Sequence, residues 1–372
     1  MPTWSGILSE VQQSAAARGP LGPDLDGIRL KYIQQLHQLS KRAVIVYASG
    51  WLRAGGRNTP DYAVEGADVH AMMEVCHAVP ERSLDLIIHS PGGSAAAAEQ
   101  TVNYLRTQFD DIRVFVPLQA KSAATMIALG ADEIFMGRYS ELGPIDPQIL
   151  IPIPGGTGRF APAHAILRDF KRAKEEIAKD VNVLAAWTPI LHAYSGGLLE
   201  FCTQQIQLAQ EIVAGWLKEH MLTHRDLGIQ DADRQQVATD IARYFGSDDA
   251  YDRFRTHDRP IRRDALEKIK GLRIRRLEDD KVLQDVVLSI YHALDISFGG
   301  PAAKIVENHR AARYIRIFQQ PVILPAFMPP GPGGAPQPAP QPTHPAARRV
   351  NAWRRLLNWG LGVFSRFRHR SG

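Results

Sequence analysis

The chain has 372 residues, of which 45% are hydrophobic and 22% are charged. It can therefore bury a large core in one large domain, or in two smaller ones plus tails. Its two cysteines, Cys76 and Cys202, suit neither a disulfide framework nor a metal site, which indicates a reducing, cytoplasmic compartment. The N-terminus lacks the layout of a signal peptide, and no apolar run approaches the length of a bilayer span.

The net charge is unevenly distributed. Residues 346–372 contain seven arginines and no acidic residue, so removing them from a net charge of +5 leaves about −2 for the rest of the chain. The main body is therefore not a basic nucleic-acid-binding domain, and no nucleic-acid partner is expected.

The first half of the chain alternates helix and strand patterns. After a loosely patterned segment at residues 1–24, helical spacing predicts helices and short β-rich apolar runs predict strands. In chain order we expect helix 28–39, strand 43–47, loop 51–62, helix 66–78, strand 84–89, an alanine-rich helix, strand 112–117, a small-residue helix and strand 134–136. This alternation favours an α/β fold with a mainly parallel sheet and right-handed crossovers.

Two of these strands end in turns that suit acyl-transfer chemistry. The strand at 84–89 ends in Ser-Pro-Gly-Gly at 90–93, where glycines without Cβ let a substrate carbonyl approach backbone N–H groups. The strand at 112–117 leads to Ser122, after which the next helix begins. If both turns lie at one edge of a sheet, one offers oxyanion donors and the other a hydroxyl.

These motifs resemble those of a known group of peptidases. SPGG, followed by a serine that opens a small-residue helix and then by an acidic-Ile-Phe-Met strand, is similar to the Clp protease subunit and signal peptide peptidase A superfamily. The run AKSAATMIALGADEIFMGRYSELGPIDPQI is closer still to the serine dehydrogenase proteinase family. The resemblance covers roughly residues 25–310. It implies a ClpP/crotonase-like ββα superhelix in a peptidase domain at 25–320.

The resemblance also implies a catalytic constellation. Ser122 would be the nucleophile, and the N–H groups of Gly93 and Ala123, with Gly92 as a further donor, would form the oxyanion hole. Signal peptide peptidase A uses a Ser–Lys dyad with the lysine on a downstream helix, and the PA…F…AK pattern matches Lys174 to it. No cofactor and no metal are expected.

Lys174 has two interpretations. In the helix predicted at 161–179 it falls between Leu167 and Phe170, and is thus expected to point toward the core. A desolvated lysine there would be a neutral general base, whereas the more common outcome is a packed stem with the ammonium at the surface. Lys171 is the second choice, and Lys121 is a poor one because it is adjacent to the serine.

Histidine and aspartate are weaker candidates for the base and its partner. The Clp subunit uses a Ser-His-Asp triad, but residues 138–148, where its histidine would lie, contain none. Asp146 lies between two prolines and more often stabilises a turn there than orients a base. His89 is expected on its strand. The histidines that lie in no recognisable motif are expected to be surface or structural residues: His164, His192 and His257. The adjacent His-Asp pair at 257–258 is discounted because neighbouring side chains do not face each other.

The second half of the chain is mostly helical by pattern. Residues 183–245 predict a helical insertion or oligomerisation arm in which Trp187 and Trp216 are core residues, and residues 282–294 and 302–317 predict closing helices. A homo-oligomer is expected from the resemblance.

The C-terminal part changes in composition. Residues 321–345 are rich in proline and glycine and predict a linker. Residues 346–372 predict a basic amphipathic helix with tryptophans on one arc and arginines on the other. Such a helix suits an anionic membrane surface, such as the inner membrane face, or alternatively a protein contact.

Two classes of function remain open. The first is a serine endopeptidase that acts on peptide or protein substrates through a Ser122–Lys174 dyad and an acyl-enzyme. The second is a non-proteolytic crotonase-fold protein, either a scaffold tethered to a membrane or partner, or an acyl-CoA enzyme. A serine at the helix-opening turn favours the first class, because acyl-CoA chemistry of the crotonase type needs no nucleophile there.

Overall fold

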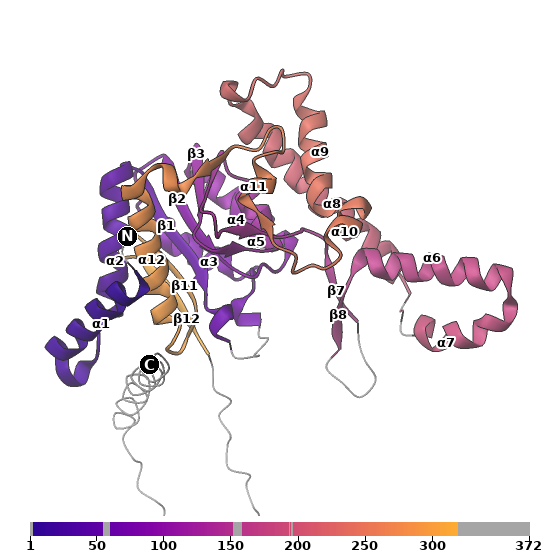
Figure 1. Ribbon diagram of the computed structural model, residues 1–372, viewed down its shortest axis with the longest axis horizontal. Coiled ribbons are helices and arrows are strands. Elements are labelled where there is room, and N and C mark those ends of the chain that lie inside the picture. Colours follow the sequence, from indigo (N-terminus) through magenta and orange to yellow (C-terminus); the bar gives the residue numbers. More distant parts are fainter. Residues whose placement is uncertain (1–2, 55–59, 152–157, 193, 195, 319–372) are drawn as a thin grey trace, which may run out of the picture.

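The computed structural model describes residues 3–54, 60–151, 158–192, 194 and 196–318 (Figure 1). The predicted linker at 321–345 and the predicted amphipathic helix at 346–372 lie outside these residues. None of the helices in the described part of the chain combines the length and the hydropathy that a bilayer-spanning helix needs.

A mixed α/β fold with a mainly parallel central sheet confirms the predicted fold class. The strand order in the sheet is β10-β5-β3-β2-β1-β11-β12, and neighbours from β10 to β1 run parallel. The last two strands, β11 and β12, run antiparallel to their neighbours. The strands of this sheet are β1 (Ala43–Ser49), β2 (Ser83–His89), β3 (Asp111–Val116), β5 (Glu133–Met136), β10 (Ile274–Arg276), β11 (Ala302–Asn308) and β12 (Arg313–Ile317).

Helices cover both faces of the sheet (Figure 1). Successive residues of β1 point to opposite faces, and both faces are buried, which explains the uninterrupted apolar run of that strand. Val44 and Val46 pack with α2 (Leu25–Ser40) and α12 (Lys281–Ser297). Ile45 and Tyr47 belong to the larger core on the other face, whose helices are α3 (Asp68–Cys76), α4 (Ala95–Gln108), α5 (Ala123–Leu129), α8 (Leu198–Glu219) and α9 (Arg234–Gly246).

Two predictions about the ends of this domain are corrected. The loosely patterned N-terminal segment contains a helix, α1 (Trp4–Arg18), which is capped by the side chain of Thr3 and packs on α12. The closing helix predicted at 302–317 is wrong, because this stretch forms the β11–β12 hairpin. Its turn has no Gly or Pro signal and is instead held by Asn308, whose side-chain oxygen accepts from the N–H groups of Arg310 and Ala312.

Smaller elements extend from the sheet toward one end of the molecule. A small sheet has the order β4-β6-β9, with β4 (Gln119–Ala120) parallel to β6 (Glu141–Leu142) and β6 antiparallel to β9 (Ile261–Arg262). A hairpin of β7 (Gln148–Ile151) and β8 (Arg159–Pro162) leads into α6 (Ala163–Lys179), which projects away from the sheet together with α7 (Leu184–His192) (Figure 1). The remaining short helices are α10 (Asp248–Phe254) and α11 (Arg263–Leu266).

The helical segment after α6 is not a separate arm throughout. Trp216 on α8 and several residues of α9 lie in the main core, and Trp216 is only 6% exposed. Among the described helices, α6 and α7 reach far from the sheet, although Trp187 on α7 is also buried as predicted.

Candidate active site

Ser122 occupies a sharp turn between β4 and α5. Its backbone has φ +48° and ψ −119°, which is strained for a residue with a side chain. The side chain does not cap the helix and is partly exposed. A serine on a strained strand-to-helix turn presents its hydroxyl outward, which is the local geometry of a nucleophile elbow.

The Ser-Pro-Gly-Gly turn lies beside the serine turn, as the sequence predicts. β2 continues past His89 to pair with β4, because the Ser90 N–H donates to Gln119 O (3.2 Å) and the Lys121 N–H donates to Ser90 O (3.0 Å). The two turns therefore leave the same end of adjacent strands.

Gly92 packs directly against the serine. It has φ +92°, and a Cβ there would lie 2.6 Å from Ser122 Cβ and 2.9 Å from the Ala123 nitrogen, besides overlapping the Lys121 carbonyl. Only glycine allows this approach. The Gly92 N–H donates to Ser90 Oγ (3.2 Å), so this predicted oxyanion donor is already occupied.

The other two predicted donors differ from Gly92. Gly93 N–H has no hydrogen-bond partner among the described residues. Ala123 is the first residue of α5, so its N–H has no acceptor one turn earlier in the helix. Gly93 follows Gly92 in the chain, and a Cβ on Gly92 would lie 2.9 Å from the Ala123 nitrogen, so both N–H groups belong to residues beside the contact between Gly92 and the Ser122 turn.

Val64 fixes the backbone on either side of Gly93. The Val64 N–H donates to Gly92 O (2.8 Å), and Val64 O accepts from the Ser94 N–H (2.9 Å). A Cβ on Gly93 would lie 2.6 Å from the Val64 nitrogen and would also overlap its oxygen, so the close contact requires glycine here. The loop before α3 thus acts as the backing for the glycine turn.

Residues beneath the serine turn are fully engaged in structural contacts. Thr125 Oγ1 donates to Ala120 O (2.7 Å) and accepts from the Gly143 N–H (2.9 Å), which ties α5 to β4 and β6. Lys121 is buried and forms an ion pair with Glu141 (2.6 Å). Lys121 therefore points away from the reacting side, as expected for a residue adjacent to the nucleophile.

The predicted orientation of Lys174 is wrong. Ile166 and Ala173 on α6 are buried, but Lys174 is exposed, as is Phe170 beside it. The physical reason is that α6 projects from the body, so that Ile166 packs with Cys202 of α8 while the part of the helix at Phe170 and Lys174 stays uncovered. A projecting helix that lacks a neighbour on part of its apolar face buries a narrower arc than the helical projection assumed. Lys171 is exposed as well.

Asp146 binds a histidine that the sequence did not connect to it. His257 Nδ1 lies 2.8 Å from Asp146 Oδ1, and Gln148 Nε2 donates to Asp146 Oδ2 (2.8 Å). Asp146 is 4% exposed, whereas the His257 side chain is 20% exposed and its Nε2 has no hydrogen-bond partner in the described part of the chain. A carboxylate that holds Nδ1 and leaves Nε2 accessible is the orientation that a general base needs.

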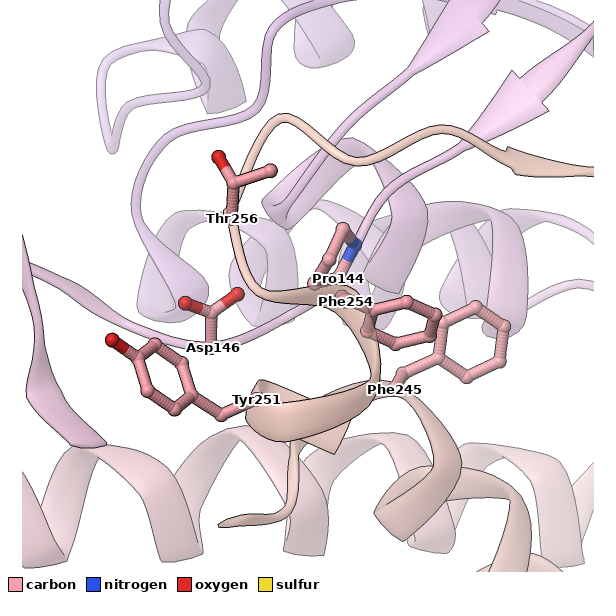
Figure 2. Close-up of a pocket in the computed structure, with 6 residues that line it drawn as sticks. All are labelled: Pro144, Asp146, Phe245, Tyr251, Phe254 and Thr256. Carbon is pink, nitrogen blue, oxygen red and sulfur yellow. The ribbon is translucent and has the colours of Figure 1, made fainter. Parts of the chain in front are cut away.

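The small sheet brings this pair to the end of the molecule where Ser122 lies. Ala120, Leu142 and Ile261 are paired across β4, β6 and β9. At this end of the small sheet, β4 continues to Ser122 and β6 continues to Asp146, while the chain enters β9 from His257. Figure 2 shows the Asp146 carboxylate directed into the gap between Tyr251 and the loop that carries Thr256. This gap, which is lined also by Pro144, has no room for a water-sized sphere.

Two other buried histidines have structural environments. His89 lies on β2, its Nδ1 is 3.1 Å from Gln119 O, and its ring contacts Tyr291 edge-on. Burial lowers the pKa of His89 to about 4. His164 has both ring nitrogens near acceptors, with Gly246 O at 3.1 Å and Asp248 Oδ1 at 3.4 Å, so neither is directed at the serine.

Within the described residues, one cluster has the composition of a metal site. Ligand atoms of His37, Glu81 and His309 lie within 4.8 Å of one another. The two imidazole rings are stacked, however, with centroids 4.1 Å apart and planes inclined by 19°. The Nε2 lone pairs lie in nearly parallel planes and cannot both point at one ion, so the residues as arranged do not fit a metal.

Comparisons with known proteins bear on this site. Residues 62–188, about a third of the chain, match the model of the ClpP-like SDH-type serine proteinases. The match includes the glycine turn, the Ser122 turn and α6, and it confirms the resemblance predicted from the motifs.

Two curated relatives come from Methanocaldococcus jannaschii and are described as uncharacterized proteins. One is 32% identical over 160 residues, which are 42% of this chain and 53% of the relative. The other is 36% identical over 118 residues, which are 32% of this chain and 37% of the relative. The chain therefore spans about half of one relative and about a third of the other.

Two solved structures also match. Both are mutants of the 1510-N membrane-bound stomatin-specific protease, one with serine replaced by alanine and one with lysine replaced by alanine in complex with a substrate peptide. Their TM-scores are 0.33 and 0.22 at 15% and 14% identity, and they cover 60% and 57% of this chain and 79% and 84% of their own. Likeness at this level carries no argument about the present chain.

Proposed function

Since residues 62–188 match the model of the ClpP-like SDH-type serine proteinases, we propose that the chain is a serine peptidase with Ser122 as its nucleophile. The observation that carries this proposal is the turn at Ser122, where a partly exposed serine with φ +48° packs against Gly92. The substrates would be peptides or proteins.

The proposed reaction uses the groups around this turn in order. Ser122 Oγ attacks the carbonyl carbon of the peptide bond while a base removes its proton, and the negative charge moves to the carbonyl oxygen. The unpaired Gly93 and Ala123 N–H groups would stabilise that oxygen. The tetrahedral intermediate collapses, the amine leaves with a proton, and water then hydrolyses the acyl-enzyme.

Two side chains compete for the role of base. The Ser122–Lys174 dyad is supported by the motif resemblance, but it requires an exposed lysine on a projecting helix to reach the serine. The His257–Asp146 pair is supported by its 2.8 Å hydrogen bond and by Nε2, which has no partner in the described part of the chain. It is also supported by the small sheet, whose strands β6 and β9 end on the side where Ser122 follows β4. We favour His257 as the base because the Asp146 carboxylate already holds its Nδ1 and leaves its Nε2 accessible to take a proton.

Labelling with a fluorophosphonate tests the proposal, because this reagent phosphonylates only activated serines. We expect wild-type protein to be labelled stoichiometrically at Ser122 and to hydrolyse a casein substrate. Ser122→Ala should abolish both, while heat-denatured wild-type protein controls for nonspecific labelling.

The alternative function has its own outcome in this experiment. A scaffold or an acyl-CoA enzyme of the same fold would have no activated serine. Absence of labelling in folded wild-type protein would therefore refute the peptidase and favour the non-proteolytic function.

We also propose a homo-oligomer and a peripheral membrane attachment through residues 346–372. The first rests on the motif resemblance, and the second on the amphipathic pattern of the sequence with its arginines. Light scattering after size-exclusion chromatography tests the first, and vesicle flotation tests the second.

A further inference from the structure

A buried ion pair lies behind the glycine turn, outside the residues assigned above. Lys304 on β11 and Asp68, the first residue of α3, both have side chains that are 0% exposed. Lys304 Nζ lies 2.6 Å from Asp68 Oδ1 and 2.7 Å from Oδ2, and it also donates to the carbonyl oxygen of Ala63 (2.6 Å). These acceptors use all three N–H bonds of the ammonium.

Asp68 completes the cluster on its other side. Its Oδ2 accepts from the Tyr47 hydroxyl (2.6 Å) and from the Glu65 N–H (3.0 Å). The ion pair therefore forms hydrogen bonds with Ala63 O and with the Glu65 N–H. These two atoms belong to the peptide groups immediately before and after Val64.

Val64 is the residue that backs the glycine turn. Its N–H and C=O bind Gly92 O and the Ser94 N–H, and the Gly93 N–H between them has no partner in the described part of the chain. The chain of contacts thus runs from Lys304 and Asp68, through both peptides of Val64, to the proposed oxyanion donor of Gly93.

We propose that Lys304 and Asp68 are positioning residues that fix the Gly93 N–H for the oxyanion. This inference rests on the proposed peptidase function. A buried ion pair is a poor means of stabilising a core, since well-packed apolar residues often do as well or better. It is a good means of holding two polar backbone groups at fixed points, because each contact is directional and charge-assisted.

The surroundings of the Lys304 ammonium fit a positioning role rather than a catalytic one. Burial lowers the pKa of Lys304, while Asp68 acts in the opposite direction. With three acceptors at 2.6–2.7 Å, Nζ has no free lone pair and no route to the substrate, so Lys304 is not itself a base. Its effect on the reaction must be transmitted through Val64.

The test compares two double variants that each neutralise one buried ion pair. Lys304→Met with Asp68→Asn removes the bond to Ala63 O and the charge of the group that accepts from the Glu65 N–H, while keeping side-chain volume and avoiding an unpaired buried charge. The control is Arg29→Met with Glu307→Gln. That pair has side chains 2% and 5% exposed, and Glu307 is on the same strand, three residues from Lys304.

The readouts separate positioning from stability. We expect the Lys304/Asp68 variant to label at Ser122 at least about tenfold more slowly and to lose kcat with KM unchanged, because an oxyanion donor acts in the transition state. The Arg29/Glu307 variant should lose thermal stability and keep the wild-type labelling rate. Equal labelling rates in the two variants, or a loss confined to KM, would overturn the proposal.

Amide hydrogen exchange gives a second measure that needs no activity. Protection of the Val64 and Ser94 amides should fall at least about tenfold in the Lys304/Asp68 variant and stay unchanged in the control. Retained protection would refute the positioning role whatever the activity. If folded wild-type protein is not labelled at all, the peptidase proposal fails, and exchange still decides whether the ion pair holds the turn.

Discussion

Replacing Gly92 with alanine should damage the site directly at the nucleophile. The new Cβ would lie 2.6 Å from Ser122 Cβ and 2.9 Å from the Ala123 nitrogen, and these neighbours are backbone or backbone-attached atoms that cannot rotate away. The φ of +92° adds strain of about 1–3 kcal/mol, and overpacking adds about 1–3 kcal/mol. The expected loss of unfolding free energy is therefore about 2–6 kcal/mol. A displacement of the nucleophile by about 1 Å would also slow acylation about 100-fold.

Gly228→Ala is the matched control. Gly228 has a φ of +63° but nothing within 4 Å of an added Cβ, so only backbone strain of about 1–2 kcal/mol is expected there. Urea unfolding and the fluorophosphonate labelling rate should be measured for both variants. If Gly92→Ala costs no more than the control and labels at the wild-type rate, the contact with Ser122 is not what requires glycine.

The other predictions concern the base, the pH dependence and the tail. His257→Gln should slow labelling of Ser122 about 100-fold or more, with partial rescue by added imidazole, whereas Lys174→Ala should label at the wild-type rate; the reverse result assigns the base to the lysine. The His89 pKa of about 4 is below that of an unfolded histidine, so its stability contribution is complete above about pH 6.5 and is lost as the pH falls toward 4. In His89→Gln, the unfolding free energy measured with urea should fall by up to about 3 kcal/mol less than in the wild type over this pH window. An unchanged dependence of that free energy on pH would contradict the burial argument. Deleting 346–372 should prevent flotation with anionic vesicles and leave hydrolysis of a small peptide unchanged; full-length protein that fails to float at low salt would rule out the membrane surface.

The sequence predicted most of the sheet because its strands are buried on both faces. Such strands read as continuous apolar runs, and the predicted ranges for β1, β2 and β3 lie within a residue or two of those observed. The hairpin at 302–317 was missed because Asn308 supplies the turn through its side chain, without the glycine or proline that usually marks one.

The two turns of the candidate site were predicted for a similar reason. Glycine and serine at strand ends are local signals, and the pairing of Ser90 with β4 places them side by side. The link between His257 and Asp146 is not local, since 111 residues separate them. Only the pairing of β9 with β6 brings them together, and two-residue strands of this kind have no recognisable periodicity. The exposure of Lys174 could not be predicted from the sequence either. A helical projection shows which side chains share a face but not which faces are covered by other elements.

The small sheet also determines when the site can form. β4 and β6 lie close together in the chain, but β9 becomes available only after α8 and α9, whose residues fill the core beneath α4 and α5, have been synthesised. Contacts between residues far apart in the chain are late events in folding. During synthesis the Ser122 turn therefore emerges from the ribosome well before the strand that closes its sheet, and a nascent chain shorter than about residue 262 lacks a complete β9, the strand that follows the proposed base His257. If the proposed peptidase uses His257, its site would stay incomplete for as long as its own C-terminal half is unfolded.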